Sequence, residues 1–219
     1  MPASRRTLLL ATGLVAAAAC ASAQAAEPAF VRHVANPWFP LRPGTVFTYT
    51  GEKDGRRGRD VVSVTHATKV IRGVRCTAVS DRLSVRGHLA ERTTDWYAQD
   101  TQGNVWYFGE DTAELNAAGK VTSREGTWRA GVHGARAGIF MPAHPKIGQS
   151  FRQEYLRGHA EDHFAVIRLS GGSMVTKEWT PLEPDTLDHK VYKRGTGLVK
   201  EETVKGGNER WTLANVRHG

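Results

Sequence analysis

Residues 45–65 read TVFTYTGEKDGRRGRDVVSVT, which is the pattern of a β-hairpin. Its outer segments, Thr45–Thr50 and Asp60–Thr65, are rich in the β-branched and aromatic residues that favour strands. Between them, Asp54-Gly55 is a dipeptide that favours the two-residue turn of a β-hairpin. The stretch therefore predicts two antiparallel strands whose basic turn, Lys53–Arg59, lies in solvent.

The same composition recurs along most of the chain. Short segments rich in Val, Thr, Trp, Tyr and Phe are separated by Gly, Pro, Asn and Asp, which predicts an antiparallel meander. The further expected strands are Arg75–Ser80, Arg82–Arg86, Thr93–Ala98, Asn104–Phe108, Val121–Trp128, Ser150–Leu156, Asp162–Leu169, Met174–Thr180, His189–Lys193, Leu198–Val204 and Arg210–Val216. Helical composition is confined to Glu110–Ala118. We expect an all-β fold with little helix.

So many strands in one chain leave sheet edges that must be paired or covered. The expected solution is a sheet curled into an open or closed barrel, and its interior or mouth is the default place for a ligand. About 190 residues suffice for one good-sized core, so residues 26–219 are expected to form a single β-rich domain.

The first residues are typical of an export signal. Arg5 and Arg6 precede an apolar run over Leu8–Ala19, and small residues follow up to Ala25. This pattern predicts a signal peptide over residues 1–25, cleaved to give a periplasmic or secreted protein. The paired arginines fit a twin-arginine signal, and an ordinary export signal is the alternative. No apolar run approaches the roughly 20 residues of a membrane span, so no integral span is expected.

Composition limits the partners. The formal net charge of +8 falls to about +6 without Arg5 and Arg6, and an exported protein is not expected to bind nucleic acid. Cys20 leaves with the leader, so Cys76 stands alone and cannot form an intramolecular disulfide. The alternating stretch around Cys76 predicts a buried, unreactive thiol.

Three groups of motifs resemble an uncharacterised group of exported bacterial proteins. The first is NPWFPLRPGT at residues 36–45, the second is DWYAQD at residues 95–100 followed by GNVWYFGE at residues 103–110, and the third is MPAHP at residues 141–145. The resemblance covers most of the chain after the leader. It implies export and supplies no functional residues, so every candidate site rests on chemistry.

Asp95 and Tyr97 form the first candidate site. Alternate side chains of a strand share a face, so these two lie on one side while Trp96 lies on the other. Across the turn that follows, Tyr107 can join them. One face would then present a carboxylate beside one or two phenols, able to orient a polar group of a ligand. The alternative is that the tyrosines are core residues with hydroxyls at the rim and that Asp95 caps a turn.

The stretch RGHAEDH, residues 157–163, is the second candidate. His159 and His163 are four residues apart and so share a face, and His144 could supply a third nitrogen. Imidazoles with a carboxylate suit a divalent transition metal such as zinc or copper. Without the glutamate of an HExxH motif, the spacing is not specific for metal.

Two other interpretations of this stretch remain open. Glu154, Glu161 and Asp162 could act with a histidine in acid/base catalysis, because close carboxylates separate their proton affinities. Alternatively, Ser150–Leu156 and Asp162–Leu169 are the arms of a hairpin and Arg157–Glu161 is its charged turn.

The sequence therefore predicts an exported protein that holds a small, apolar or aromatic ligand in a barrel-like cavity. The alternative is an enzyme on the same scaffold, dependent on metal or on acid/base residues, of lyase, hydratase or isomerase type. The sequence leaves open whether the chain is an enzyme, which cofactor it uses and what its oligomeric state is.

Overall fold

The computed structural model describes residues 28–219, so the expected signal peptide over residues 1–25 lies outside the described part. The described chain is all β, without a helix, and its fifteen strands form one antiparallel sheet. They are β1 (Val46–Lys53), β2 (Arg56–Ile71), β3 (Val74–Val85), β4 (His88–Gln99), β5 (Val105–Leu115), β6 (Val121–Ser123), β7 (Trp128–Arg129), β8 (Arg136–Met141), β9 (Ser150–Arg152), β10 (Glu154–Tyr155), β11 (His163–Ser170), β12 (Ser173–Trp179), β13 (Leu187–Lys193), β14 (Gly197–Lys205) and β15 (Arg210–Arg217). The predicted fold class is confirmed.

Tight turns build both halves of the sheet. Asp54 and Gly55 both have positive φ angles, and Lys53 pairs directly with Arg56, so the first hairpin has the predicted two-residue turn. The same geometry recurs at Arg72-Gly73, and β1 to β5 follow one another as neighbours. β11 to β15 form a second meander, whose first hairpin turns at Gly171-Gly172.

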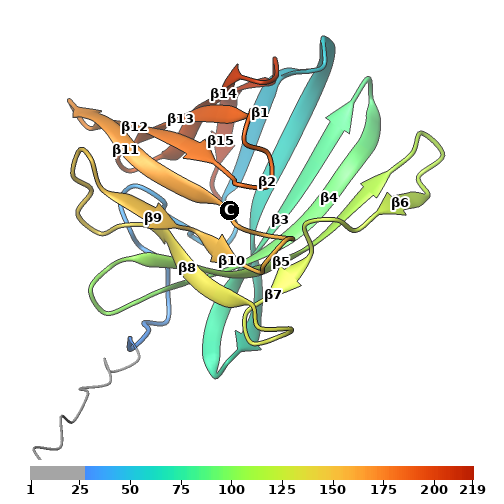
Figure 1. Ribbon diagram of the computed structural model, residues 1–219. Coiled ribbons are helices and arrows are strands. Elements are labelled where there is room, and N and C mark those ends of the chain that lie inside the picture. Colours follow the sequence, from blue (N-terminus) through green and yellow to red (C-terminus); the bar gives the residue numbers. More distant parts are fainter. Residues whose placement is uncertain (1–27) are drawn as a thin grey trace, which may run out of the picture.

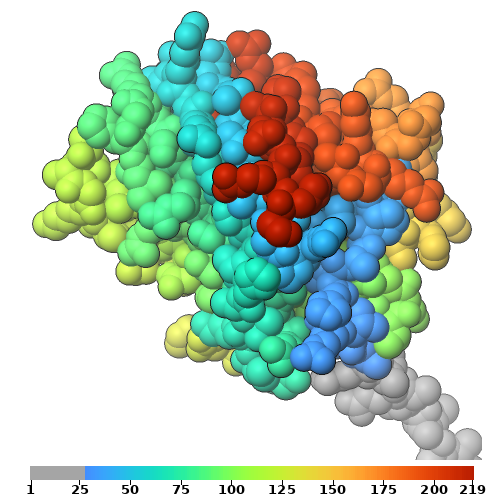
Figure 2. Space-filling view, turned by 180° about the vertical axis from the view of Figure 1, so that it is seen from behind, coloured from blue at the N-terminus to red at the C-terminus, as the bar shows by residue number. Residues whose placement is uncertain are grey.

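The two meanders join at a seam between the first and last strands. β1 pairs with β15 from Val46↔Arg217 to Glu52↔Arg210. Figure 1 shows β2 to β5 as one wall and β11 to β14 as the other, with β8 to β10 crossing between them. Figure 2 shows the C-terminal residues, in red, lying against the early strands from behind.

A bent segment brings the two outer edges of the sheet together. β9 pairs with β11 at one edge, and β10 pairs with β8 at the other, yet only Gln153 separates β9 from β10. The amide of Gln153 donates to the carbonyl of Asp162 at 2.7 Å. We call Ser150–Tyr155 the clasp, because it makes the curled sheet nearly closed. The expected barrel-like sheet is thus confirmed.

Three segments differ from the sequence prediction. The expected helix at Glu110–Ala118 is wrong: its first part continues β5, because pairing with β4 outweighs local helical composition. The expected strand Val121–Trp128 is broken by a turn into β6 and β7. β8 was not predicted, because it begins within the glycine-rich residues 131–138, which are typical of a loop.

The wall is held by interlocking side chains. Trp211 of β15 covers two glycines: a Cβ on Gly58 would lie 2.5 Å from its ring, and one on Gly51 would lie 2.8 Å from it.

Cys76 is fully buried, and burial raises the pKa of its thiol to about 12. Among residues 28–219 no helix has the length and apolarity that a membrane crossing needs.

Candidate functional site

An apolar cavity of about 180 Å³ lies inside the sheet. Aromatic and aliphatic side chains from both meanders form most of its wall, among them Phe39, Leu41, Phe47, Val62, Val79, Phe140, Leu198 and Trp211. An engineered cavity of roughly 150 Å³ lined by such residues binds benzene. The cavity therefore has the size and lining for a ligand with one small ring.

Three aspartates enter this apolar cavity in a diagonal row across neighbouring strands. Asp60 lies on β2, Asp81 on β3 and Asp95 on β4, and each is displaced by two residues from its neighbour's directly paired partner. Burial, together with Asp60, raises the pKa of Asp81 well above its usual range. Burial raises the pKa of Asp95 to about 7, against a smaller lowering by Tyr107. The carboxyl of Asp95 can therefore donate or accept a proton near neutral pH.

Asp95 and two tyrosines form the predicted polar face. The hydroxyl of Tyr107 donates to Oδ1 of Asp95 at 2.6 Å, and the rings of Tyr97 and Tyr107 stack with centroids 4.8 Å apart. The alternative is confirmed in one part, because Tyr97 and Tyr107 are buried core residues, and is wrong in the other, because Asp95 does not cap a turn. Asp100 has that role, because its carboxylate accepts from the amides of Gln102 and Asn104.

Lys190 of β13 lies between this cavity and a second one. Its ammonium group is 2.9 Å from a carboxylate oxygen of Glu178 and 3.5 Å from one of Glu201. These two carboxylates raise the pKa of Lys190 despite the opposing effect of burial, so the lysine is charged. Lys190 is thus a charged residue inside the barrel, and Glu178 and Glu201 form ion pairs with it.

The second cavity is larger, about 520 Å³, and is strongly acidic. We call it the acidic cavity. It shares only Lys190 with the apolar cavity, and eight carboxyl groups line it: Glu110, Glu114, Glu125, Glu154, Asp162, Glu178, Glu183 and Asp188. Lys190 is the one lysine or arginine among its described lining residues. The lining of this cavity is therefore acidic although the whole chain has an excess of basic residues.

Glu110 of the acidic cavity lies next to Asp95 of the apolar cavity. It pairs directly with Asp95 across β4 and β5, because a bulge opposite Trp96 and Tyr97 brings Glu110 onto the interior face. Burial, the Asp95 charge and the Glu154 charge raise the pKa of Glu110 well above its usual range. The diagonal row of carboxyls thus continues from the apolar cavity into the acidic one.

Glu154 is the most enclosed carboxyl of the acidic cavity. Its side chain belongs to the clasp, the residue is only 6% exposed, and the indole N–H of Trp128 donates toward its carboxyl. Burial, with repulsion from Asp162, raises the pKa of Glu154 to about 8. Glu154 is thus a buried carboxyl held against the Trp128 indole inside the clasp.

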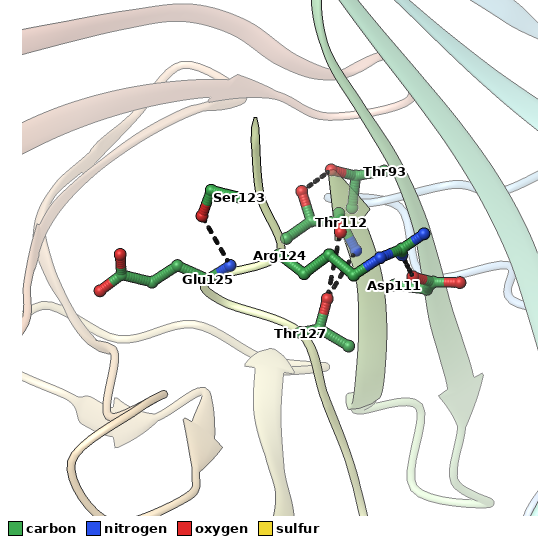
Figure 3. A network of polar contacts seen from close by, with 7 residues as sticks. All are labelled: Thr93, Asp111, Thr112, Ser123, Arg124, Glu125 and Thr127. Atoms are coloured by element: carbon green, nitrogen blue, oxygen red, sulfur yellow. Dashed lines mark hydrogen bonds and ion pairs between the residues drawn. The ribbon is translucent and has the colours of Figure 1, made fainter. Parts of the chain in front are cut away.

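Glu125 reaches the rim of the acidic cavity from a hairpin anchored on β5. The Thr127 hydroxyl accepts from the amide of Thr112 at 3.0 Å and donates to its carbonyl at 3.2 Å. Figure 3 shows the Glu125 side chain pointing away from Arg124 and Asp111, which pair with each other at 3.0 Å. The hairpin thus directs the Glu125 carboxylate toward the cavity, whereas Asp111 of β5 lies on its outer side.

The structure divides the predicted catalytic residues between the two cavities and a turn. Asp95 and Tyr97 line the apolar cavity, whereas Glu154 and Asp162 line the acidic one. Glu161 lines neither; its carboxylate accepts from the amide of Gly158 at 2.8 Å and so closes the turn. Leu156 bridges to Ala160, so Arg157–Glu161 forms the charged turn that the sequence offered as one interpretation.

The structure does not bring the three candidate metal ligands together. His144 lines a separate groove beside Asn36, and His159 lies at the acidic cavity. Nε2 of His163 accepts from Arg152 at 3.1 Å, and its ring stacks on Trp179. Within residues 28–219 no three His, Cys, Asp or Glu side chains are placed to share one metal ion.

Several residues of the site were not identified from the sequence. Asp60 and Asp81 lie in alternating strands where a polar residue usually faces solvent, and Lys190 and Glu201 lie in a segment dense with charges. The signal that could have found Asp81 is its strand parity with the apolar Val79, which faces the same cavity.

No family model and no curated protein matches the chain. Two solved structures resemble it at low identity. One is a protein of Bacteroides fragilis described as exported and as having a YmcC-like fold; it has 12% identity and a TM-score of 0.47, covering 82% of this chain and 98% of that one. The other is described as a lipoprotein of Parabacteroides distasonis, with 10% identity and a TM-score of 0.41, covering 87% of this chain and 100% of that one. Similarity at this level carries no argument about function.

Proposed function

We propose that this chain is an exported binding protein that holds a small apolar or aromatic molecule in its apolar cavity. The ligand body would contact the aromatic and aliphatic wall, and a polar end would meet the carboxyl of Asp95. The observation that carries the proposal is the composition of the cavity, because an apolar wall with a few convergent polar groups is typical of a ligand site.

Binding can be tested with small aromatic probes. Phenol or indole should bind the purified chain in a calorimetric titration, and the fluorescence of Trp211, which lines the cavity, should change. Val62→Phe fills the cavity and is expected to abolish binding. Val61→Phe, the matched control on the opposite face of the same strand, should bind as the original chain does. Unchanged binding to Val62→Phe contradicts the proposal.

Export is the second part of the proposal and rests on the sequence. The basic start, the apolar run and the small residues before Ala25 support it, as do the motifs shared with exported bacterial proteins. Mass spectrometry of the protein from its native compartment should show a chain beginning at Gln24 or Ala26. A full-length chain retained in the cytoplasm would refute export.

An acid/base enzyme is the second candidate function. It is favoured by Asp95, whose carboxyl is hydrogen-bonded to Tyr107 and has a pKa of about 7 in a largely apolar space. Such a group can remove a proton next to a carbonyl while a phenol stabilises the enolate. Cyclohexanone in heavy water should then gain deuterium faster with the chain than in buffer, and Asp95→Asn should abolish the gain.

A further inference from the structure

We propose that the outer face of β2, β3 and β4 docks on a membrane surface made of anionic phospholipids. Arg59, Arg82 and Arg92 lie at the centre of this face, one on each strand, and we call it the arginine face. The site goes beyond the proposed function, because it lies on the side of the wall away from the apolar cavity.

Strand alternation places the three arginines outside the barrel. Arg59 directly precedes Asp60, which lines the apolar cavity. Arg82 directly follows Asp81, which lines the same cavity. Because successive side chains of a strand point to opposite faces, both arginines point outward. Arg92 pairs directly with Arg82 and so shares its face, and all three residues are exposed.

The charge of these arginines is not neutralised by the chain. Among residues 28–219 the side chains of the three form no ion pair and no hydrogen bond. The acids Glu52 and Asp111 on the same outer side are already paired, with Arg210 at 2.6 Å and with Arg124 at 3.0 Å.

Two of the arginines face each other across the sheet. Arg82 lies directly opposite Arg92 on the neighbouring strand. Like charges in this position are destabilising, so the folded chain holds them together against their repulsion. An anionic partner between them would remove that repulsion.

The chemistry of the face suits phosphate. A guanidinium group presents a planar fork of donors that matches two oxygens of one phosphate group. Hydroxyl side chains lie between the arginines: Ser84 is directly opposite Arg59, and Ser80 is directly opposite Thr94. These hydroxyls can donate to phosphate oxygens that the guanidinium groups leave free.

The positive charge extends along the strands as well as across them. Arg57 and Arg86 are exposed near the ends of two neighbouring hairpins, where the amide of Arg86 donates to the carbonyl of Arg57 at 3.0 Å. Both hairpins end on the same side of the wall (Figure 1). Phospholipid headgroups form a plane of phosphates and can contact the face in both directions, whereas a linear polyanion or a single ion would contact only part of it.

Vesicle sedimentation tests the proposal. The chain beginning at residue 26 is used, because the apolar run Leu8–Ala19 would bind lipid by itself. At about 150 mM salt the chain should sediment with vesicles of phosphatidylglycerol and phosphatidylcholine, and remain in solution with pure phosphatidylcholine. At about 1 M salt, where charges are screened beyond about 3 Å, binding should weaken at least about tenfold.

Two competitors identify the source of the negative charge. Inorganic phosphate that displaces the vesicles at the same phosphate concentration would show a site for the free ion. An oligogalacturonate that binds more tightly than the vesicles would show a site for an acidic glycan. Either result overturns the proposal, as does equal binding to pure phosphatidylcholine.

Variants locate the binding. Arg82→Gln and Arg92→Gln should each weaken vesicle binding about fivefold, which is the usual contribution of one basic residue at an anionic membrane. Arg168→Gln, which removes the same charge from an exposed position of β11, is the matched control and should leave binding unchanged. Equal weakening by all three would show that net charge acts instead of the arginine face, and would overturn the proposal.

Two further measurements separate docking from folding and from the apolar cavity. Arg82→Gln and Arg92→Gln should melt no lower than the original chain, because each removes the repulsion between the two arginines. Both should bind phenol as the original chain does, since they lie outside the apolar cavity. Loss of vesicle binding together with an unchanged melt and unchanged phenol binding therefore supports the proposal.

Discussion

The hydroxyl of Tyr107 donates a 2.6 Å hydrogen bond to Oδ1 of Asp95 across two neighbouring strands of the barrel wall. The bond ties β4 to β5 beside the apolar cavity, which Asp95 lines. It also opposes the effect of burial on the carboxyl, because a donor stabilises the ionised form.

Tyr107→Phe should therefore destabilise the chain and raise the pKa of Asp95 further. Loss of a buried donor to a carboxyl costs about 1–3 kcal/mol. Urea unfolding at pH 8, where Asp95 is largely ionised, should show the larger loss, and unfolding at pH 5 the smaller. Tyr155→Phe, in the clasp, serves as a control that should show no such dependence on pH. An equal loss at both pH values would show that the bond does not act on the charge.

The folded chain should lose stability as pH rises from about 4 to about 8. In the unfolded chain Asp95 releases its proton near pH 4, whereas in the folded chain it holds the proton to about pH 7. Within that window the folded state binds more protons, so raising the pH favours unfolding. Glu154, with its pKa raised to about 8, acts in the same direction.

Asp95→Asn should flatten this decline, which thermal melts at several pH values can measure. Asp111→Asn, an exposed carboxylate paired with Arg124, should leave the decline as it is. A stability that rises between pH 5 and pH 7 in the original chain would show that these carboxyls are ionised in the folded state.

Gly138→Ala should open the seam between β8 and the clasp. A Cβ at this position would lie 2.2 Å from the carbonyl oxygen of Arg152 and 2.7 Å from the backbone of Gln153, so the backbone must move. Hydrogen exchange should speed up in Arg136–Met141 and in the clasp, with the β1–β15 seam still protected. Gly207→Ala, whose Cβ would meet only the side chain of Thr203, is the control.

Cys76 should not react with Ellman's reagent in the folded chain. The thiol is fully buried and burial raises its pKa to about 12, so the reactive thiolate is scarce. A chain beginning at residue 26, where Cys76 is the remaining cysteine, should react fully after denaturation in urea. Rapid reaction without denaturant would show that the strand around Cys76 opens readily.

His159→Ala and His163→Ala should differ in their effect on stability. His159 is exposed, so its loss should change the free energy of unfolding by no more than about 0.5 kcal/mol. His163 stacks on Trp179 and accepts from Arg152, so its loss should cost about 1 kcal/mol. Urea titrations give both values. Equal effects would contradict the placement of His163.

The sequence predicted those features that depend on residue type and strand parity. Asp54-Gly55 fixed the first turn, and alternation correctly placed Asp95, Tyr97 and Tyr107 on one face. Alternation no longer predicts the buried face beyond a bulge, however, because one extra residue moves every later side chain of the strand to the opposite face. The bulge in β5 therefore hid Glu110, whose segment also has helical composition.

The two cavities could not be predicted for a related reason. They depend on contacts between strands far apart in the chain, such as β1 against β15, and on the bend at Gln153. Neither composition nor spacing encodes which strand lies opposite which across a closed sheet. RGHAEDH was conspicuous by composition, yet most of its residues form a turn at the cavity's edge.

The seam between β1 and β15 has a consequence for how the chain reaches its native state. Val46 pairs with Arg217, so forming this contact closes a very long loop of the chain. The entropy lost in closing that loop opposes the pairing before it contributes any stability. Contacts of such long range make folding slow. On the ribosome, one edge of β1 stays unpaired until Arg210–Arg217 has emerged, and during that interval the incomplete sheet can pair with other chains.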